Sequence, residues 1–193
     1  MGWAHQTYAE FLAAHYIKIH NMPLPQVISL ITHPGDPEGK LVPQLHGTSA
    51  WLATMRNDVF QHIMGIDPLV LLRSDLGGVD DEYKENIVEK LLALYDEDKL
   101  SYPDWRDMAL YVNLSHPRLA DQIREYICDN EKSIESREVA IRIASACNEQ
   151  VLQDDLVEIA LDPSQPLEAR EEAAGAISII GDGTVKKRLK PLT

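Results

Sequence analysis

An internal repeat in the second half of the chain constrains the fold more than any other feature of the sequence. Three similar segments, RDMALYVNL, REVAIRIAS and REEAAGAIS, begin at Arg106, Arg137 and Arg170, with offsets of 31 and 33 residues. A second series lies between them and begins at Leu119 and Leu152, which are 33 residues apart. A helix pair that recurs at this period is typical of an α-solenoid, because one pair cannot bury its apolar stripe alone.

The first helix of each predicted pair carries an alanine at the same place. Ala109, Ala140 and Ala173 align when the three segments are superposed. A small side chain at this position lets a neighbouring helix approach closely. We therefore expect about three stacked helix pairs in this part of the chain.

Helical periodicity also runs through the N-terminal part, and no convincing period-2 strand is found in the sequence. An apolar stripe at helical spacing is formed by Tyr8, Phe11, Leu12, Tyr16 and Ile19. Proline and glycine divide the next segment into a loop at 33–40 and short helices over 25–32, 43–55, 58–64 and 66–75, before an amphipathic helix over 80–95. The sequence thus predicts an all-α chain with an irregular helical subdomain at 1–75 and a solenoid at 76–193.

The charge of the chain argues against two classes of partner. The 193 residues include 18 Lys and Arg against 31 Asp and Glu, which gives a net charge of −13. Residues 67–180 alone carry 11 basic and 26 acidic side chains. Nucleic acids and anionic membrane surfaces are bound through clustered cations, so we expect neither as a partner.

Cysteine and histidine do not form a recognisable catalytic or metal-binding pattern. Cys128 and Cys147 are too few for a disulfide framework and lie in apolar stripes, so we expect buried, reduced thiols and a cytoplasmic protein. A catalytic pair of Cys128 with His116 is conceivable, but a helix length separates the two. Six of seven histidines precede residue 63, but no HExxH occurs, and we predict no metal site and no catalytic residue.

Acidic and aromatic residues each allow two interpretations. The acidic residues 154, 155 and 158, and 168, 171 and 172, are expected to line solvated helix faces, although such faces can attract a basic partner. Four aromatic residues are expected at the joints between repeats, with a peptide-binding groove as the alternative: Trp51, Tyr102, Trp105 and Tyr111.

The last repeat resembles a HEAT repeat. Residues 170–192, REEAAGAISIIGDGTVKKRLKPL, have the arginine, the paired alanines, the apolar run and the Gly-Asp turn of that repeat. The resemblance covers roughly residues 101–193. It implies a HEAT-like solenoid and is almost silent on function.

The N-terminus resembles a motif of bacterial NACHT-type NTPases of the STAND class, approximately F-x-H-x-[ST]-F-x-E-[FY]-x-A-A. The matching segment is WAHQTYAEFLAA at residues 3–14, and residues 50–76 look like the helical region that follows the motif. The matched positions are Trp3, His5, Thr7, Tyr8, Glu10, Phe11, Ala13 and Ala14. The resemblance implies that residues 1–75 contain the end of the winged-helix part of the nucleotide-binding module and pack against that module.

In that family the histidine of the motif lies near the β-phosphate of bound ADP and helps to hold the inactive state. The resemblance gives this role to His5, as a cofactor contact in a full-length parent that binds ATP or ADP; the alternative is that His5 only caps or packs against its helix. No GxxxxGK[ST] phosphate loop occurs, so we expect this chain to neither bind nor hydrolyse nucleotide. The motif begins at residue 3, and we expect the chain to be part of a longer protein in which Met1 is an artificial start.

We therefore predict a non-catalytic sensor, interaction and autoinhibitory region of a NACHT/STAND signalling NTPase, a class in which some members act in antiphage defence. Its partner would be another protein or its own nucleotide-binding module, and the apolar residues of the first helix also allow self-association. One alternative is a free-standing HEAT-like scaffold for protein–protein interaction. The other is a HEAT-type bilin lyase, for which the sequence has no chromophore-handling motif.

Overall fold

The computed structural model describes residues 6–36, 39–73, 80–100 and 108–189. These residues form helices and loops without a β-strand, which confirms the predicted all-α class; one isolated antiparallel bridge joins Thr32 and Leu41. The chain divides into two compact units, residues 1–79 (unit 1) and 80–193 (unit 2), and each is described by itself. Within the described ranges, no helix combines the length and the apolar character needed to cross a membrane.

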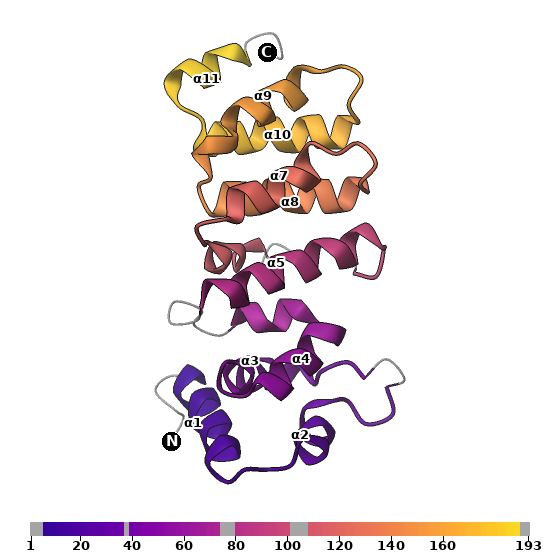
Figure 1. Cartoon of the computed structure of the whole chain (residues 1–193), viewed down its shortest axis with the longest axis vertical. Helices are drawn as coiled ribbons and strands as arrows, with labels where there is room; N and C mark the ends of the chain where they lie inside the picture. Colours follow the sequence, from indigo (N-terminus) through magenta and orange to yellow (C-terminus); the bar gives the residue numbers. More distant parts are fainter. Residues whose placement is uncertain (1–5, 37–38, 74–79, 101–107, 190–193) are drawn as a thin grey trace. The chain divides into compact units, whose positions relative to one another are not determined.

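Unit 1 is built around one short central helix (Figure 1). Its elements are α1 (Gln6–Ile19), α2 (Leu24–Ile31), the 3-10 helix η1 (Pro43–Leu45), α3 (His46–Met55), α4 (Asn57–Ile66) and the 3-10 helix η2 (Pro68–Arg73). Helix α3 packs against α1, α4 and η2, and Ala50 and Leu52 in it are fully buried. Of the loop predicted at 33–40, residues 33–36 and 39–40 lie outside any helix and residues 37 and 38 are outside the described ranges. Gly35 and Gly39 have positive φ, where a side chain would be strained.

The helix predicted over 66–75 is a 3-10 helix rather than an α-helix. The sequence predicts an α-helix over 66–75 capped by Asp67, but the structure has the 3-10 helix η2 over Pro68–Arg73, and residues 74 and 75 lie outside the described ranges. Pro68, Val70, Leu71 and Leu72 are all buried in this short segment. With four of its six residues buried, the segment has no exposed polar face of the kind that an amphipathic α-helix shows.

Unit 2 consists of helices that stack one after another (Figure 1). Its elements are α5 (Asp81–Asp96), η4 (Tyr111–Leu114), α7 (Leu119–Ile127), α8 (Ile134–Ala146), η5 (Gln150–Leu152), α9 (Gln153–Leu161), α10 (Leu167–Ile180) and α11 (Gly183–Arg188). Helix α8 packs on α5, α7 and α10, while α9 packs on α10 and α11. This arrangement is compatible with a helical solenoid.

The first predicted repeat differs from the other two. Residues 101–107 lie outside the described ranges; of the rest of the expected helix from Arg106, Met108 is helical, Ala109 and Leu110 form a turn, and the 3-10 helix η4 follows. Ala140 and Ala173 are fully buried, as expected for close helix contact, whereas Ala109 is exposed in the turn. The prediction from the alignment is therefore wrong for Ala109, because an alanine exposed in a turn packs against no neighbouring helix.

Two arginines at equivalent repeat positions connect successive helices. Arg137 donates from Nε and Nη2 to the carbonyl oxygen of Ile127, at 3.4 and 3.3 Å, and Arg170 donates from Nε to the carbonyl oxygen of Ala160 at 3.3 Å. Each arginine lies ten residues after the carbonyl that it binds, near the end of the preceding helix. Such donors satisfy carbonyls that have no partner within their own helix. The 33-residue repeat in sequence is thus also a repeat of one specific contact.

Ion pairs between residues about one repeat apart add a second set of connections. Three of them are Arg118–Glu85, Arg124–Asp155 at 3.0 Å and Arg142–Glu172 at 2.6 Å, and Arg188–Asp154 is a fourth. Each joins residues of neighbouring repeats. Surface pairs of this kind contribute little individually, but they fix which acidic side chains are neutralised.

Loss of the Arg137 contact should destabilise unit 2. Arg137 is 2% exposed, and its Nη2 also donates to Gln165 Oε1 at 2.8 Å. In Arg137→Met the carbonyl of Ile127 and the amide oxygen of Gln165 lose their donor, which should cost about 1–3 kcal/mol. Urea unfolding followed by circular dichroism measures this cost. Lys187→Met, at an exposed position of α11, is the matched control and should change stability by less than about 0.5 kcal/mol; an equal effect of both variants would contradict the assigned role.

Candidate functional site

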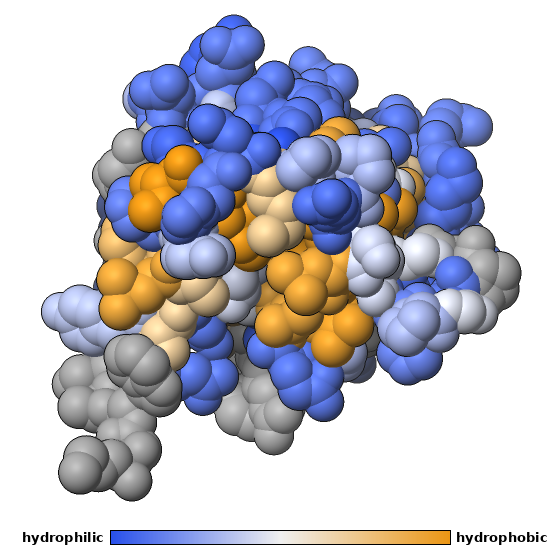
Figure 2. All heavy atoms as spheres, turned by 90° about the horizontal axis from the view of Figure 1, so that it is seen from below, coloured by the Kyte–Doolittle hydropathy of each residue, from blue (hydrophilic) through white to orange (hydrophobic). Residues whose placement is uncertain are grey.

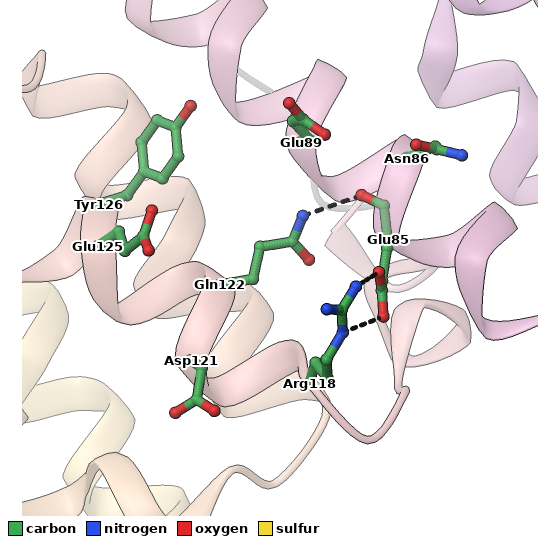
Figure 3. Close-up of a pocket in the computed structure, with 8 residues that line it drawn as sticks. All are labelled: Glu85, Asn86, Glu89, Arg118, Asp121, Gln122, Glu125 and Tyr126. Atoms are coloured by element: carbon green, nitrogen blue, oxygen red, sulfur yellow. Dashed lines mark hydrogen bonds and ion pairs between the residues drawn. The ribbon is translucent and has the colours of Figure 1, made fainter.

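Helices α5 and α7 of unit 2 enclose a groove with a volume of about 420 Å³ (Figure 3). We call it the acidic groove, and it is lined by Glu85, Asn86, Glu89, Arg118, Asp121, Gln122, Glu125 and Tyr126. Four carboxylates thus face one guanidinium. Residues three or four apart lie on the same face of a helix, so the spacing within 85–89 and within 118–126 brings both sets to the groove.

An ion pair closes one end of the acidic groove. Arg118 binds Glu85 with two nitrogens, Nε to Oε1 at 2.7 Å and Nη2 to Oε2, and Gln122 Nε2 donates to the Glu85 carbonyl oxygen at 2.9 Å (Figure 3). The hydrogen bond from Arg118 lowers the pKa of Glu85, and the same bond raises the pKa of Arg118. Glu85 is therefore an anion at neutral pH that already has its cation.

A buried histidine lies beside this ion pair. The side chain of His116 is fully buried, and its Nδ1 lies 3.9 Å from Glu85 Oε1. Burial lowers the pKa of His116 and outweighs the opposing attraction of Glu85. The imidazole is therefore neutral at pH 7 and adds no positive charge beneath the groove.

The other end of the acidic groove has carboxylates without a cation. Glu89 comes from α5, and Glu125 comes from α7 beside Tyr126 (Figure 3). Within the described ranges neither glutamate forms an ion pair, whereas Asp121 pairs with Arg124 at 3.1 Å. Uncompensated negative charge is thus concentrated at the end where α5 faces Tyr126.

The ring of Tyr126 already contacts one cation of the chain. Lys132 Nζ lies 4.7 Å from the ring centroid and 3.1 Å from Asp96 Oδ2. Burial raises the pKa of the Tyr126 phenol, so the phenol stays protonated and its ring is a neutral π surface. An ammonium over a tyrosine ring is attracted by the ring quadrupole. Chemically, the acidic groove is suited to attract and hold cationic side chains.

The residues singled out in the sequence lie elsewhere. His5 and Trp3 are outside the described ranges, as are Tyr102 and Trp105. Trp51 is half-buried and contacts Phe11 edge to face, with 5.3 Å between the ring centroids. Tyr111 is fully buried. Among the described residues, no group of three or more His, Cys, Asp and Glu side chains is placed to hold a metal ion.

One of the two cysteines differs from expectation. The sequence predicts that Cys128 is buried, but it is exposed where α7 ends, because the apolar face of that helix is completed by Ile123 and Ile127 instead. Cys147 is half-buried, its thiol donates to the Tyr111 carbonyl oxygen at 3.2 Å, and burial raises its pKa to about 12. The Cys147 thiol is thus unreactive at neutral pH.

The predicted solvated acidic faces are partly wrong. Asp155 and Glu172 have side chains only 31% and 24% exposed, and they pair with arginines of the neighbouring repeat. The Gly-Asp turn at 181–184 has a structural role as well: Asp182 caps α11 by accepting from the backbone nitrogens of Thr184 and Val185. A side chain at Gly181 would lie 2.6 Å from the Ile177 carbonyl oxygen, so this position requires glycine.

Sequence reasoning missed the acidic groove, although a signal for it exists. Glu85 and Glu89 are four residues apart, as are Asp121 and Glu125, on two helices that the repeat makes neighbours. The sequence allows a peptide-binding groove at Trp51, Tyr102, Trp105 and Tyr111. The aromatic residue that lines the acidic groove is instead Tyr126. Comparisons of the chain with protein-family models, with curated proteins and with solved structures found no match.

Protonation of His116 should make unit 2 less stable in mild acid. Because burial lowers the pKa of His116 from 6.5, the unfolded chain binds the proton more readily than the folded one. The contribution of His116 to the free energy of unfolding should therefore be complete above pH 6.5 and be lost progressively as the pH decreases below that value. His116→Asn removes the titrating group and should show a smaller fall over the same range in urea unfolding experiments. Equal pH dependence of both proteins would contradict a buried, neutral His116.

Proposed function

We propose that this chain is a non-catalytic recognition module whose acidic groove binds a cationic segment of a partner protein. The observation that carries the proposal is the pair Glu89 of α5 and Glu125 of α7, which line the groove together with Tyr126 and have no ion pair among the described residues. A lysine or arginine side chain placed between them would meet two carboxylates and the edge or face of an aromatic ring.

The physical chemistry favours a weak and salt-sensitive interaction. Exposed ion pairs contribute about 0.2–1 kcal/mol each, and a cation over an exposed aromatic ring about 0.5–1 kcal/mol. Several such contacts are therefore needed for useful affinity, which a segment with repeated cations supplies. The excess of acidic over basic residues within 67–180 also attracts such a segment from a distance.

The Glu85–Arg118 pair makes the two ends of the acidic groove different in charge. Among the described lining residues Arg118 is the single cation, and its charge is neutralised by Glu85, just as Lys132 beside the Tyr126 ring is neutralised by Asp96. The attraction is therefore left to Glu89 and Glu125. Arg118 is held by two hydrogen bonds to Glu85, so a ligand cation would have to displace it to enter there. A cationic segment should thus enter the acidic groove from the side of Tyr126.

Binding of an octalysine peptide tests the proposal. The variant Glu89→Gln/Glu125→Gln should weaken binding about tenfold, equivalent to about 1.4 kcal/mol, because two carboxylate contacts are lost without a change of shape. Fluorescence anisotropy of a labelled peptide, measured at low salt, gives the dissociation constants.

The matched control is Glu168→Gln/Glu171→Gln, which removes the same charge from exposed positions of α10. It should weaken binding less than about twofold, through long-range attraction alone. Equal weakening by the two pairs would mean that the peptide responds to net charge, and the groove would lose its role. Absence of binding to the wild-type chain would overturn the proposal outright.

Within this role we propose the sensor and autoinhibitory region of a cytoplasmic NACHT/STAND signalling NTPase. The support is the resemblance of residues 3–14, of which residues 6–14 lie on α1. The genomic sequence upstream of Met1 tests this origin: an in-frame phosphate loop GxxxxGK[ST] is expected. An in-frame stop codon directly before Met1 would overturn the NACHT/STAND origin and favour a free-standing HEAT-like scaffold.

The proposal also predicts that the chain does not turn over nucleotide. No phosphate loop lies in the sequence, and none of the described residues that line the groove is a nucleophile held by a base. Release of inorganic phosphate from ATP should stay at the level of a buffer blank over hours. Turnover that co-purifies with the chain and scales with its concentration would contradict a non-catalytic module.

A further inference from the structure

Helix α1 of unit 1 exposes large apolar and aromatic side chains beside its packing contacts with α3. Ala14 and Ile17 are buried toward the unit, where α1 packs on α3. The large side chains on the other faces are exposed: Tyr8 by 66%, Phe11 by 37%, Leu12 by 48%, Tyr16 by 57% and Ile19 by 56%. We call these five residues the α1 stripe, and Figure 2 shows hydrophobic side chains gathered at this end of the chain.

The two halves of the α1 stripe differ in shape. The N-terminal half borders a hollow of about 510 Å³ lined by Thr7, Tyr8, Phe11 and Trp51. Phe11 is held there by its edge-to-face contact with Trp51, at 5.3 Å. The C-terminal half consists of Tyr16 and Ile19, which are more than half exposed. The ring centroids of Tyr16 and His20 are 4.1 Å apart. One half is thus a receptor for an apolar side chain, and the other half supplies apolar side chains.

We infer that the α1 stripe binds the α1 stripe of a second copy of this chain, with the two helices antiparallel. A two-fold axis near the middle of the helix places Tyr8 of one copy opposite Ile19 of the other, and Leu12 opposite Tyr16. The hollow of each copy then receives side chains from the C-terminal half of its partner. A surface that carries both a hollow and the groups that fill it is self-complementary, as a two-fold interface requires.

Charge and area both fit a second copy. Residues 1–66 carry three basic and four acidic side chains, so two copies can meet here without the repulsion that the acidic residues 67–180 would cause. The five residues of the α1 stripe include no carboxylate. Their side chains expose on the order of 500 Å², which is large for one apolar patch of a monomer and more than half of the roughly 800 Å² per partner in a standard interface.

Sedimentation equilibrium of the whole chain tests the dimer. The apparent mass should rise with concentration from 21.7 kDa toward twice that value. Leu12→Glu places a carboxylate close to the axis in both copies and should weaken association at least tenfold. Ile179→Glu is the matched control, because Ile179 is 68% exposed on α10 of unit 2 and lies outside the stripe; it should leave the mass curve unchanged.

Cysteine cross-linking tests the antiparallel arrangement separately. In a Cys128→Ser background, a mixture of Tyr8→Cys and Ile19→Cys chains should form a mixed disulfide faster than either variant forms one with itself. A mass of 21.7 kDa up to about 0.5 mM would overturn the inference, since even a weak dimer would be populated there. Equal cross-linking in all three samples would overturn the antiparallel pairing. Neither result bears on peptide binding by the acidic groove.

Discussion

The packing of α8 between its neighbours is the interaction on which the rest of unit 2 depends. Val139, Ala140, Ile141, Ile143 and Ala144 of α8 are all fully buried, so this helix has almost no solvent face of its own. Arg137 at its start binds the end of the preceding helix through the Ile127 carbonyl oxygen, and burial lowers the pKa of Arg137. Burial of this arginine costs desolvation free energy, which its hydrogen bonds to the Ile127 carbonyl oxygen and the Gln165 amide oxygen offset in part. The same bonds connect the helices on either side of α8. Arg170 repeats the contact one unit later, with more solvent around it.

The acidic groove follows from this spacing. Helix α5 packs on both α7 and α8, and the side chains that line the space between α5 and α7 are too polar to join the core. The ion pairs between repeats then determine the charge pattern that remains. Glu85 is neutralised by Arg118, and Asp155 by Arg124, whereas Glu89 and Glu125 keep their charge. The binding surface that we propose therefore consists of the carboxylates that the ion pairs between repeats leave without a cation among the described residues. Unit 1 has a different surface, the apolar one on α1.

The regular part of the fold could be predicted from the sequence, and the irregular part could not. Ala140 and Ala173 identify buried positions because helical packing repeats their environment, and the prolines and glycines of 33–40 identify a loop by local chemistry. Pro68–Arg73 forms a 3-10 helix in which Pro68, Val70, Leu71 and Leu72 are all buried, whereas Tyr111–Leu114 forms one that buries only Tyr111 and Leu114. Segments this short contain too few residues for periodicity to predict their conformation. The acidic groove needed the pairing of α5 with α7, a contact between residues 33 apart such as Glu85 and Arg118. The spacing of the repeat predicts that α5 and α7 are neighbours, but it does not predict which carboxylates form an ion pair.

Hydrogen–deuterium exchange of the whole chain, with and without an octalysine peptide, tests the central claim most directly. We predict slower exchange on peptide binding in two separate segments, residues 85–89 of α5 and 118–126 at α7, because the peptide bridges them and suppresses local opening. Exchange in α1 and α10 should not change. Protection centred on α10, or spread evenly over the acidic helices, would contradict the assignment of the recognition surface to the acidic groove.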